Sequence, residues 1–183
     1  RGVVREETLI ISIAAGKTVG WIEQQFQKPI KLVRTMPNTP ALVGEGVTGI
    51  CCNALVSEEE KQTVLKIFRS FGKAETMTES MIDVVGAVSG SSPAYVFMFI
   101  EAMADAAVAE GMPRAMAYEF ASQAVLGSAK MVLETGKHPG ELKDMVCSPA
   151  GTTIEGVQVL ETKGMRSAVM EAIRACVSKT RML

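Results

Sequence analysis

Apolar positions in the first 78 residues come in short blocks that are typical of buried strands. The run Leu9–Ile13 is continuously hydrophobic and ends in two alanines and a glycine, which is the pattern of a strand buried on both faces. We predict further strands at Ile30–Val33, Gly46–Cys52 and Lys73–Met77. Helical periodicity lies between them, at Trp21–Phe26 and from Ser57 to Gly72. Alternating strands and helices predict an α/β segment.

From Glu79 onward the strand pattern is replaced by helical patterns. Ser92 and Pro93 match an N-cap and first-turn pair, so a long apolar helix is expected to begin there and to end at Gly111. Further helices are expected at Pro113–Gly136, Pro139–Met145, Thr152–Gly164 and Met165–Leu183. Thr152 and Glu155 match a capping box. The two longest helices are apolar almost all round, which is typical of a core or a subunit interface. We therefore predict two domains, residues 1–78 and residues 79–183.

Composition and charge exclude several classes of protein. Of the 183 residues 48% are hydrophobic, which excludes intrinsic disorder. Nineteen basic residues face twenty acidic ones, and this balance does not indicate a nucleic-acid partner. The longest uncharged stretch, Val84–Ile100, is interrupted by glycines, serines and a proline, so we expect no membrane span. No signal peptide is visible, and the chain reads as the middle of a longer protein.

The few cysteines and the single histidine restrict the chemistry further. Four cysteines without C-x-x-C spacing and one histidine argue against a metal site and indicate a reducing compartment. His138 precedes a proline at a helix start, where a local hydrogen bond is expected rather than acid catalysis. Cys147 is the one cysteine in a candidate site, and without a basic neighbour it is expected to be a spectator.

Three small-residue segments are candidate binding sites. Cys147–Thr153 leads into a helix, whose first N–H groups could hold a carboxylate or phosphate. Ser89–Ala94 also leads into a helix. From the residues alone, ordinary helix capping is favoured over ligand binding at both segments. Ile13–Gly16 and Met36–Pro40 follow neighbouring strands, and ligands of open α/β sheets lie at such ends. The glycine fingerprint G-x-G-x-x-G and the P-loop are absent from this sequence.

Five segments together resemble the pyrroline-5-carboxylate reductase family. They are SIAAG at 12–16, MPNTPALVGEG at 36–46, DVVGAVSGSSPAY at 83–95, HPGELKDMVCSPAGTTIEGVQVLE at 138–161 and GMRSAVMEAI at 164–173. They occur in family order from near residue 9 to the end. The resemblance implies part of a Rossmann domain followed by an all-helical domain that forms dimers, and in many members decamers.

The resemblance also implies an activity and a location. Members reduce the cyclic imine 1-pyrroline-5-carboxylate to L-proline with NADPH or NADH, the last step of proline biosynthesis, in the cytoplasm. The first half of the Rossmann domain, which carries the glycine fingerprint, is not among these residues. The 183 residues alone are therefore expected to be inactive, and poorly soluble as a monomer.

The resemblance assigns roles to particular residues. Thr153 would orient or protonate the ring nitrogen of the imine and is the expected catalytic residue. The other residues expected at the substrate are Ser148, Thr152 and Glu79. Those expected at the cofactor are Ile13, Ala14, Ala15, Asn38 and Met145. No metal is expected.

Three positions depart from the family pattern. Met145 stands where some members have an asparagine that contacts the cofactor, Gly136 where some have a glutamate, and Ala150 where glycine is common. A main-chain anion site would survive these changes, whereas cofactor affinity is placed in doubt.

Two other functions fit the pattern. One is another imine or hydroxyacid reductase with a Rossmann domain and helices, in which Lys130 would be the catalytic lysine. The other is a non-catalytic helical oligomerisation module. A pure scaffold, however, does not need a Ser148–Thr153 loop rich in small and hydroxyl residues.

Overall fold

The computed structural model describes residues 4–183 and separates into two compact units. The first comprises the residues up to Pro93 together with Glu171–Leu183, and the second comprises Ala94–Met170. In chain order, the strands and helices of the described residues are β1 (Leu9–Ser12), α1 (Val19–Phe26), β2 (Lys31–Met36), η1 (Thr39–Val43), β3 (Gly46–Cys52), α2 (Glu58–Arg69), β4 (Gly72–Thr76), α3 (Glu79–Val85), η2 (Gly86–Ser91), α4 (Ser92–Ala109), α5 (Arg114–Thr135), α6 (Pro139–Val146), α7 (Thr152–Thr162) and α8 (Met165–Thr180). The structure therefore has a small α/β part followed by helices, as expected, while the domain boundary at residue 78 stays a prediction.

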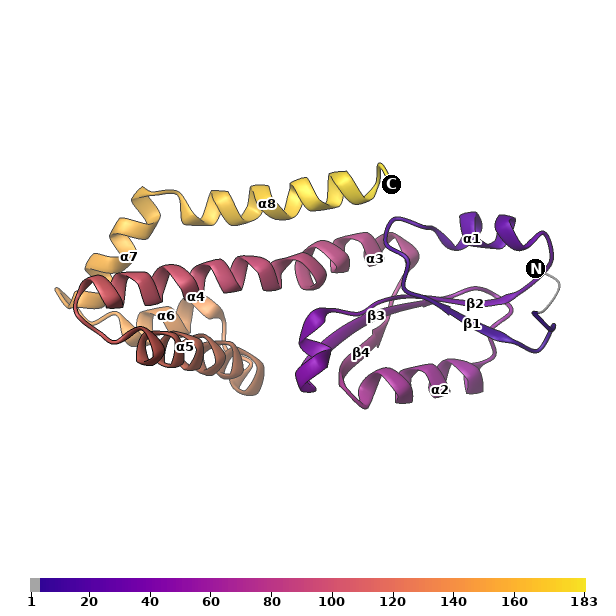
Figure 1. Cartoon of the computed structure of the whole chain (residues 1–183), viewed down its shortest axis with the longest axis horizontal. Coiled ribbons are helices and arrows are strands. Elements are labelled where there is room, and N and C mark those ends of the chain that lie inside the picture. Colours follow the sequence, from indigo (N-terminus) through magenta and orange to yellow (C-terminus); the bar gives the residue numbers. More distant parts are fainter. Residues whose placement is uncertain (1–3) are drawn as a thin grey trace. The chain divides into compact units, whose positions relative to one another are not determined.

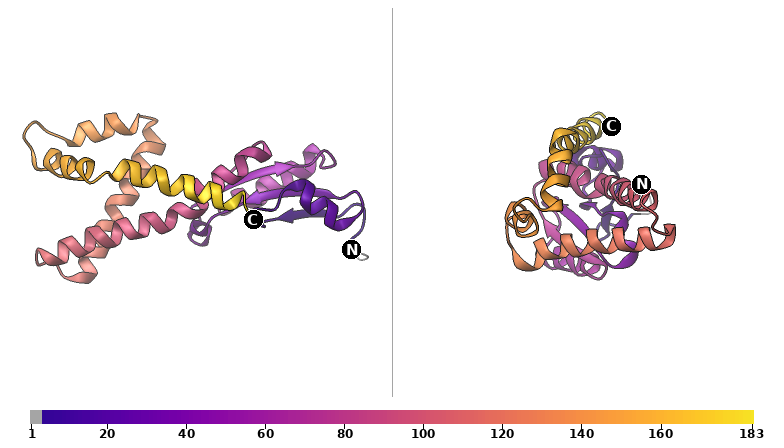
Figure 2. Two further views of the ribbon diagram at one scale, coloured as in Figure 1. Left: turned by 90° about the horizontal axis from the view of Figure 1, so that it is seen from above. Right: turned by 90° about the vertical axis from the view of Figure 1, so that its left-hand side faces the viewer.

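The four strands form one mixed sheet in the order β1-β2-β3-β4 (Figures 1 and 2). β1 and β2 are parallel, β2 and β3 antiparallel, and β3 and β4 parallel. All four predicted strands are present. β2 continues beyond the predicted Val33 to Met36, and five of its six residues are buried. Because both faces of this strand are covered, polar Arg34 and Thr35 are buried with it, which hides its length from a hydrophobicity pattern.

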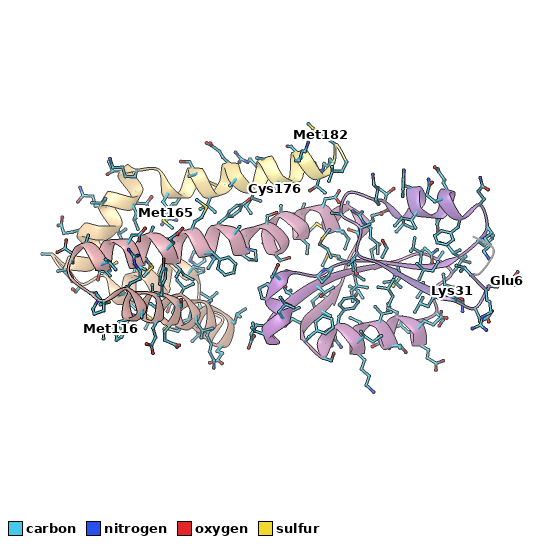
Figure 3. All side chains as sticks on the ribbon, in the orientation of Figure 1. Glu6, Lys31, Met116, Met165, Cys176 and Met182 are labelled. Atoms are coloured by element: carbon cyan, nitrogen blue, oxygen red, sulfur yellow. The ribbon has the colours of Figure 1, made fainter. Side chains whose placement is uncertain are left out.

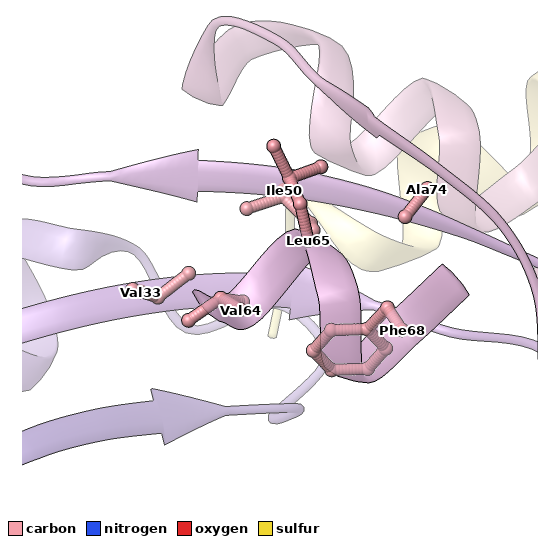
Figure 4. Close-up of a cluster of buried hydrophobic side chains, with 6 residues drawn as sticks. All are labelled: Val33, Ile50, Val64, Leu65, Phe68 and Ala74. Carbon is pink, nitrogen blue, oxygen red and sulfur yellow. The ribbon is translucent and has the colours of Figure 1, made fainter. Parts of the chain in front are cut away.

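Helices cover both faces of the sheet because successive side chains of a strand point to opposite sides. Val33 packs with Ile50 and with Val64 of α2, in a cluster shown in Figure 4. Its neighbour Leu32 packs on the other side with Ile22 of α1. Figure 1 shows α1 and α3 on one side of the sheet and α2 on the other. These contacts hold the carboxyl ends of β1 and β2 beside each other.

The helix predicted to begin at Ser92–Pro93 begins earlier. Helix α3 starts at Glu79 and continues through the π-helical turn η2 into α4, so that Glu79–Ala109 is one helix. The expected N-cap is wrong because Ser92 itself is helical, and its hydroxyl donates back to the Val88 carbonyl. Proline is tolerated here because the π turn has already displaced the regular hydrogen-bond ladder.

The second unit buries few of its apolar side chains. Its buried residues among the described positions are Ala104, Ala117, Ala121 and Leu142. Large apolar side chains such as Phe97 and Phe120 are each 62% exposed, and Figure 3 shows side chains such as Met116 on α5. By length and composition Glu79–Ala109 is also the one described helix that could cross a membrane. An exposed apolar surface of this extent marks an interaction site.

Candidate functional site

A tight turn joins α6 to α7 in the second unit. The Gly151 N–H donates to the Ser148 carbonyl at 3.0 Å. Ala150 has φ 55°, a left-handed conformation that a residue with a side chain rarely adopts. A Cβ on residue 151 would collide with Ser148 Oγ, so any larger residue there would have to displace the serine hydroxyl. The turn thus brings the Ser148 hydroxyl close to the beginning of α7.

Helix α7 begins without a side-chain cap. Its N-cap is Gly151, and no side-chain capping hydrogen bond is present here among the described residues. The predicted capping box is wrong because Thr152 is already the first helical residue, which moves Glu155 one position too far along. Ser148, Thr152 and Thr153 are all exposed. Uncapped N–H groups and the helix dipole make such a terminus suited to an anion.

The expected cofactor residues at the first strand lie at the carboxyl end of the sheet. Ile13, Ala14 and Ala15 directly follow β1 and are exposed, Ile13 by 65%. The Thr35 hydroxyl donates to the Ser12 carbonyl at 3.2 Å and fixes this end of β1 beside β2. An exposed isoleucine and two alanines leave a small apolar surface on which a flat ring can lie.

The C-terminal residues that follow α8 lie beside this same segment. Lys17 Nζ donates to the Leu183 carbonyl at 2.6 Å, and a Cβ on Gly16 would meet the Leu183 side chain at 2.5 Å. Gly16 has φ 73°. The glycine at the end of SIAAG therefore allows both the turn and the close approach of α8.

The Asn38 side chain bonds to two main-chain groups. Its Oδ1 accepts from the Val47 N–H at 2.8 Å, and its Nδ2 donates to the Ser89 carbonyl at 3.1 Å. Because one partner is a donor and the other an acceptor, the orientation of the amide is fixed chemically. One N–H of Nδ2 is left over for a ligand.

Glu79 belongs to a buried ionic cluster that the sequence analysis missed. Its Oε1 accepts from Arg34 Nη1 at 3.1 Å and from the Val19 N–H at 2.6 Å. Arg34 Nη2 also binds Asp83 at 2.8 Å, and the Arg34 side chain is only 1% exposed. A charged residue at an inward position of a buried strand was the available signal. The pKa of the adjacent Cys51 thiol is raised by burial and by the Glu79 charge, so this thiol stays protonated at neutral pH.

The other candidates have local partners or lie exposed. His138 is the N-cap of α6, and its Nδ1 accepts from the Gly140 N–H at 3.0 Å, which confirms the expected local bond. Lys130 forms an exposed pair with Glu134 at 3.4 Å. Met145 is 63% exposed near the end of α6. Gly136 ends α5 with φ 66°, a conformation that favours glycine.

The predicted site residues fall into two groups. Ile13, Ala14, Ala15, Asn38 and Glu79 belong to the first unit. Within that unit the first four follow the carboxyl ends of the parallel strands β1 and β2. Glu79 lies in the Arg34 cluster. The second unit holds Met145, Ser148, Thr152 and Thr153, of which the last three surround the start of α7.

Comparison with known proteins identifies the family. Residues 79–183 match the family model described as "Pyrroline-5-carboxylate reductase dimerisation". The chain is 61% identical over 180 residues to the pyrroline-5-carboxylate reductase of Escherichia coli, covering 98% of this chain and 67% of that protein. It is 49% identical to the Methanosarcina acetivorans enzyme, covering 93% of this chain and 63% of the relative.

Solved structures agree with this assignment. The Plasmodium falciparum pyrroline carboxylate reductase with NADP bound superposes with a TM-score of 0.91 at 37% identity, covering 95% of this chain and 70% of that one. The Coxiella burnetii enzyme gives a TM-score of 0.89 at 37% identity, covering 96% and 66%. The present chain thus spans about two thirds of the length of its relatives and belongs to the pyrroline-5-carboxylate reductase family.

Proposed function

We propose that this chain is the substrate-binding and dimer-forming part of an enzyme that reduces 1-pyrroline-5-carboxylate to L-proline with NADPH or NADH. The observation that carries the proposal is the uncapped start of α7, surrounded by the hydroxyls of Ser148, Thr152 and Thr153, in a chain of this family. The substrate is a carboxylate with an imine nitrogen nearby. Such a helix start offers N–H donors and positive potential to the first group and hydroxyls to the second.

The substrate carboxylate would bind the first N–H groups of α7, with the Ser148 hydroxyl as a further donor. The Ala150–Gly151 turn holds these donors in place before the substrate arrives, and this lowers the entropic cost of orienting it. The Thr153 hydroxyl would then contact the ring nitrogen. The hydroxyl oxygen can accept a hydrogen bond from the N–H of the protonated imine and so stabilise this form, which is the better hydride acceptor.

The residues at the end of β1 suit a nicotinamide cofactor. Exposed Ile13, Ala14 and Ala15 present small apolar surfaces and main chain at the carboxyl edge of the sheet, which is where ligands bind in open α/β sheets. When bound there, the reduced cofactor supplies the hydride for the imine carbon. Asn38 lies in the loop after the neighbouring strand β2 and would hold that loop through its bonds to Val47 and Ser89. We assign Glu79 an indirect part, because its Oε1 is already engaged by Arg34 and Val19.

Assembly and location complete the proposal. The dimerisation family model and the exposed apolar helices support a homo-oligomer built through the helical part, and we propose dimers that assemble further into decamers. Four cysteines without a disulfide suit the reducing cytoplasm. The exposed Lys130–Glu134 pair does not favour the lysine-dependent hydroxyacid reductases as an alternative.

The test uses the full-length parent protein, which is expected to oxidise NADPH or NADH when 1-pyrroline-5-carboxylate is added. Thr153→Ala should lower kcat roughly tenfold to a hundredfold because the hydroxyl that contacts the ring nitrogen and stabilises its protonated form is lost. Cofactor KM should change by less than about threefold, because removing a group used mainly in the transition state leaves ground-state binding in place. Both constants follow from initial rates of absorbance loss at the reduced-cofactor band.

Thr162→Ala is the matched control at the other end of α7, where the Thr162 hydroxyl donates to the Gln158 carbonyl at 2.8 Å within the helix. It should leave both constants near those of the parent. No absorbance loss in the parent would contradict the proposed reaction, and an effect of Thr153→Ala on cofactor KM alone would remove Thr153 from the chemistry.

A further inference from the structure

The π turn η2 interrupts the long helix next to a proline. Pro93 has no N–H, so it cannot donate to the Ser89 carbonyl four residues earlier, where a regular helix forms a hydrogen bond. Side-chain hydroxyls also bond nearby carbonyls, since Ser89 Oγ donates to the Val85 carbonyl at 2.7 Å and Ser92 Oγ donates to the Val88 carbonyl. The Ser89 carbonyl receives the Asn38 amide from outside the helix at 3.1 Å.

Asn38 supplies a donor where the helix lacks its regular one. Its Nδ2 occupies the role that the main-chain N–H of residue 93 has in an uninterrupted helix. Its Oδ1 is held by the Val47 N–H at the start of β3, and Asn38 itself directly precedes η1. One half-buried side chain thus joins the loop after β2, the strand β3 and the π turn. All of these residues lie in the first unit.

We propose that Asn38 is a positioning residue for this enzyme, acting through the Ser89 carbonyl rather than through the cofactor. The two Asn38 bonds, to Val47 and to Ser89, form a clamp that fixes the loop after β2. This loop borders the end of β1 where the cofactor is proposed to bind. The kinetic part of this inference rests on the proposed function, whereas the structural part does not. The proposal predicts that the effect of replacing Asn38 depends on whether residue 93 is proline.

The test is a double-mutant cycle in the full-length parent with Asn38→Asp and Pro93→Ala. Asn38→Asp keeps the acceptor for Val47 and removes the donor for Ser89, so it should lower the folding equilibrium constant roughly tenfold or more. It should also raise cofactor KM. Pro93→Ala restores a main-chain N–H that can donate to Ser89. In that background Asn38→Asp should cost less than about threefold in both quantities.

Denaturant unfolding measures the folding equilibrium constant, and steady-state kinetics at neutral pH measures cofactor KM. If Asn38→Asp raises cofactor KM equally with and without Pro93→Ala while stability is unchanged, Asn38 is a direct cofactor contact and the clamp is wrong. If Asn38→Asp does not fold alone, recovery of folded protein by Pro93→Ala supports the clamp, and failure of both to fold contradicts it. Unfolding needs no substrate, so it decides the clamp even if the proposed reaction fails.

Discussion

At the scale of single residues, the turn before α7 contains a backbone conformation that its residue type does not favour. Ala150 holds φ 55° in the turn before α7, although an alanine there costs about 1 kcal/mol or more relative to its relaxed conformations. A Cβ on the neighbouring Gly151 would displace the Ser148 hydroxyl. The geometry of the candidate anion site at α7 is therefore maintained at a local cost, which is common where backbone groups serve a ligand.

Ala150→Gly should relieve this strain. We expect the variant to be at least as stable as the parent, because the strain removed offsets the roughly 0.4–1 kcal/mol that glycine costs through the unfolded state. The control is Ala168→Gly on an exposed face of α8, which should destabilise by about 1 kcal/mol. Urea unfolding at one fixed protein concentration compares them. Equal destabilisation by both changes would show that residue 150 is not strained.

At the scale of elements, an ionic cluster attaches α3 to the sheet and to α1. The Arg34 side chain is 1% exposed, while Glu79 and Asp83 remain 35% and 20% exposed. The Glu79 carboxylate also accepts the Val19 N–H at the first turn of α1, where a negative charge suits the helix dipole. Arg34 therefore links β2 to α3, and Glu79 extends this link to α1. The Arg34 Nε has no hydrogen-bond partner among the described residues.

Arg34→Met tests this role. Removing the guanidinium leaves two carboxylates near each other without their cation, and we expect a loss of about 2–4 kcal/mol in the free energy of unfolding. This lies at the lower end of values for broken buried pairs because both acids are partly solvated. Arg5→Met is the control, since the Arg5–Glu7 pair is exposed by 80% and 67% and should cost little. Similar losses in both variants would contradict a structural role for the cluster.

At the scale of the whole molecule, the helical part has too small a core to explain how apolar its helices are. Its helices are rich in apolar residues, yet side chains such as Phe97, Met98 and Leu133 are more than 60% exposed. A chain of the dimerisation family would cover this surface with a second copy. The apolar composition of the helices is thus explained by association between subunits more than by packing within one.

Phe97→Glu should disrupt that association, because a buried unpaired carboxylate is costly in an interface. We expect the oligomer to dissociate or to weaken at least tenfold, measured by sedimentation or by light scattering after gel filtration. Gln123→Glu adds the same charge at an exposed polar position of α5 and should leave the assembly intact. An unchanged oligomer for Phe97→Glu would place the interface elsewhere.

Sequence patterns predicted the order of the strands and helices because hydrophobic periodicity and capping residues act locally. They located the α6–α7 turn by its hydroxyl and glycine residues and predicted the local bond of His138. They failed where a distant partner decides the structure. Ser92–Pro93 resembles a helix start, but the π turn and the Asn38 amide allow the helix to pass through it. Thr152-x-x-Glu155 resembles a capping box, but the turn before it starts the helix one residue earlier.

The sequence by itself therefore determined the family, the α/β-then-helical order and the candidate anion site, since these depend on short motifs and on residue types. Only the tertiary structure decided that Arg34 binds Glu79 and Asp83, and that Asn38 binds Ser89 fifty-one residues away. Those contacts join segments far apart in the chain. Their partners become neighbours only when the sheet and the long helix pack together, which local patterns do not encode.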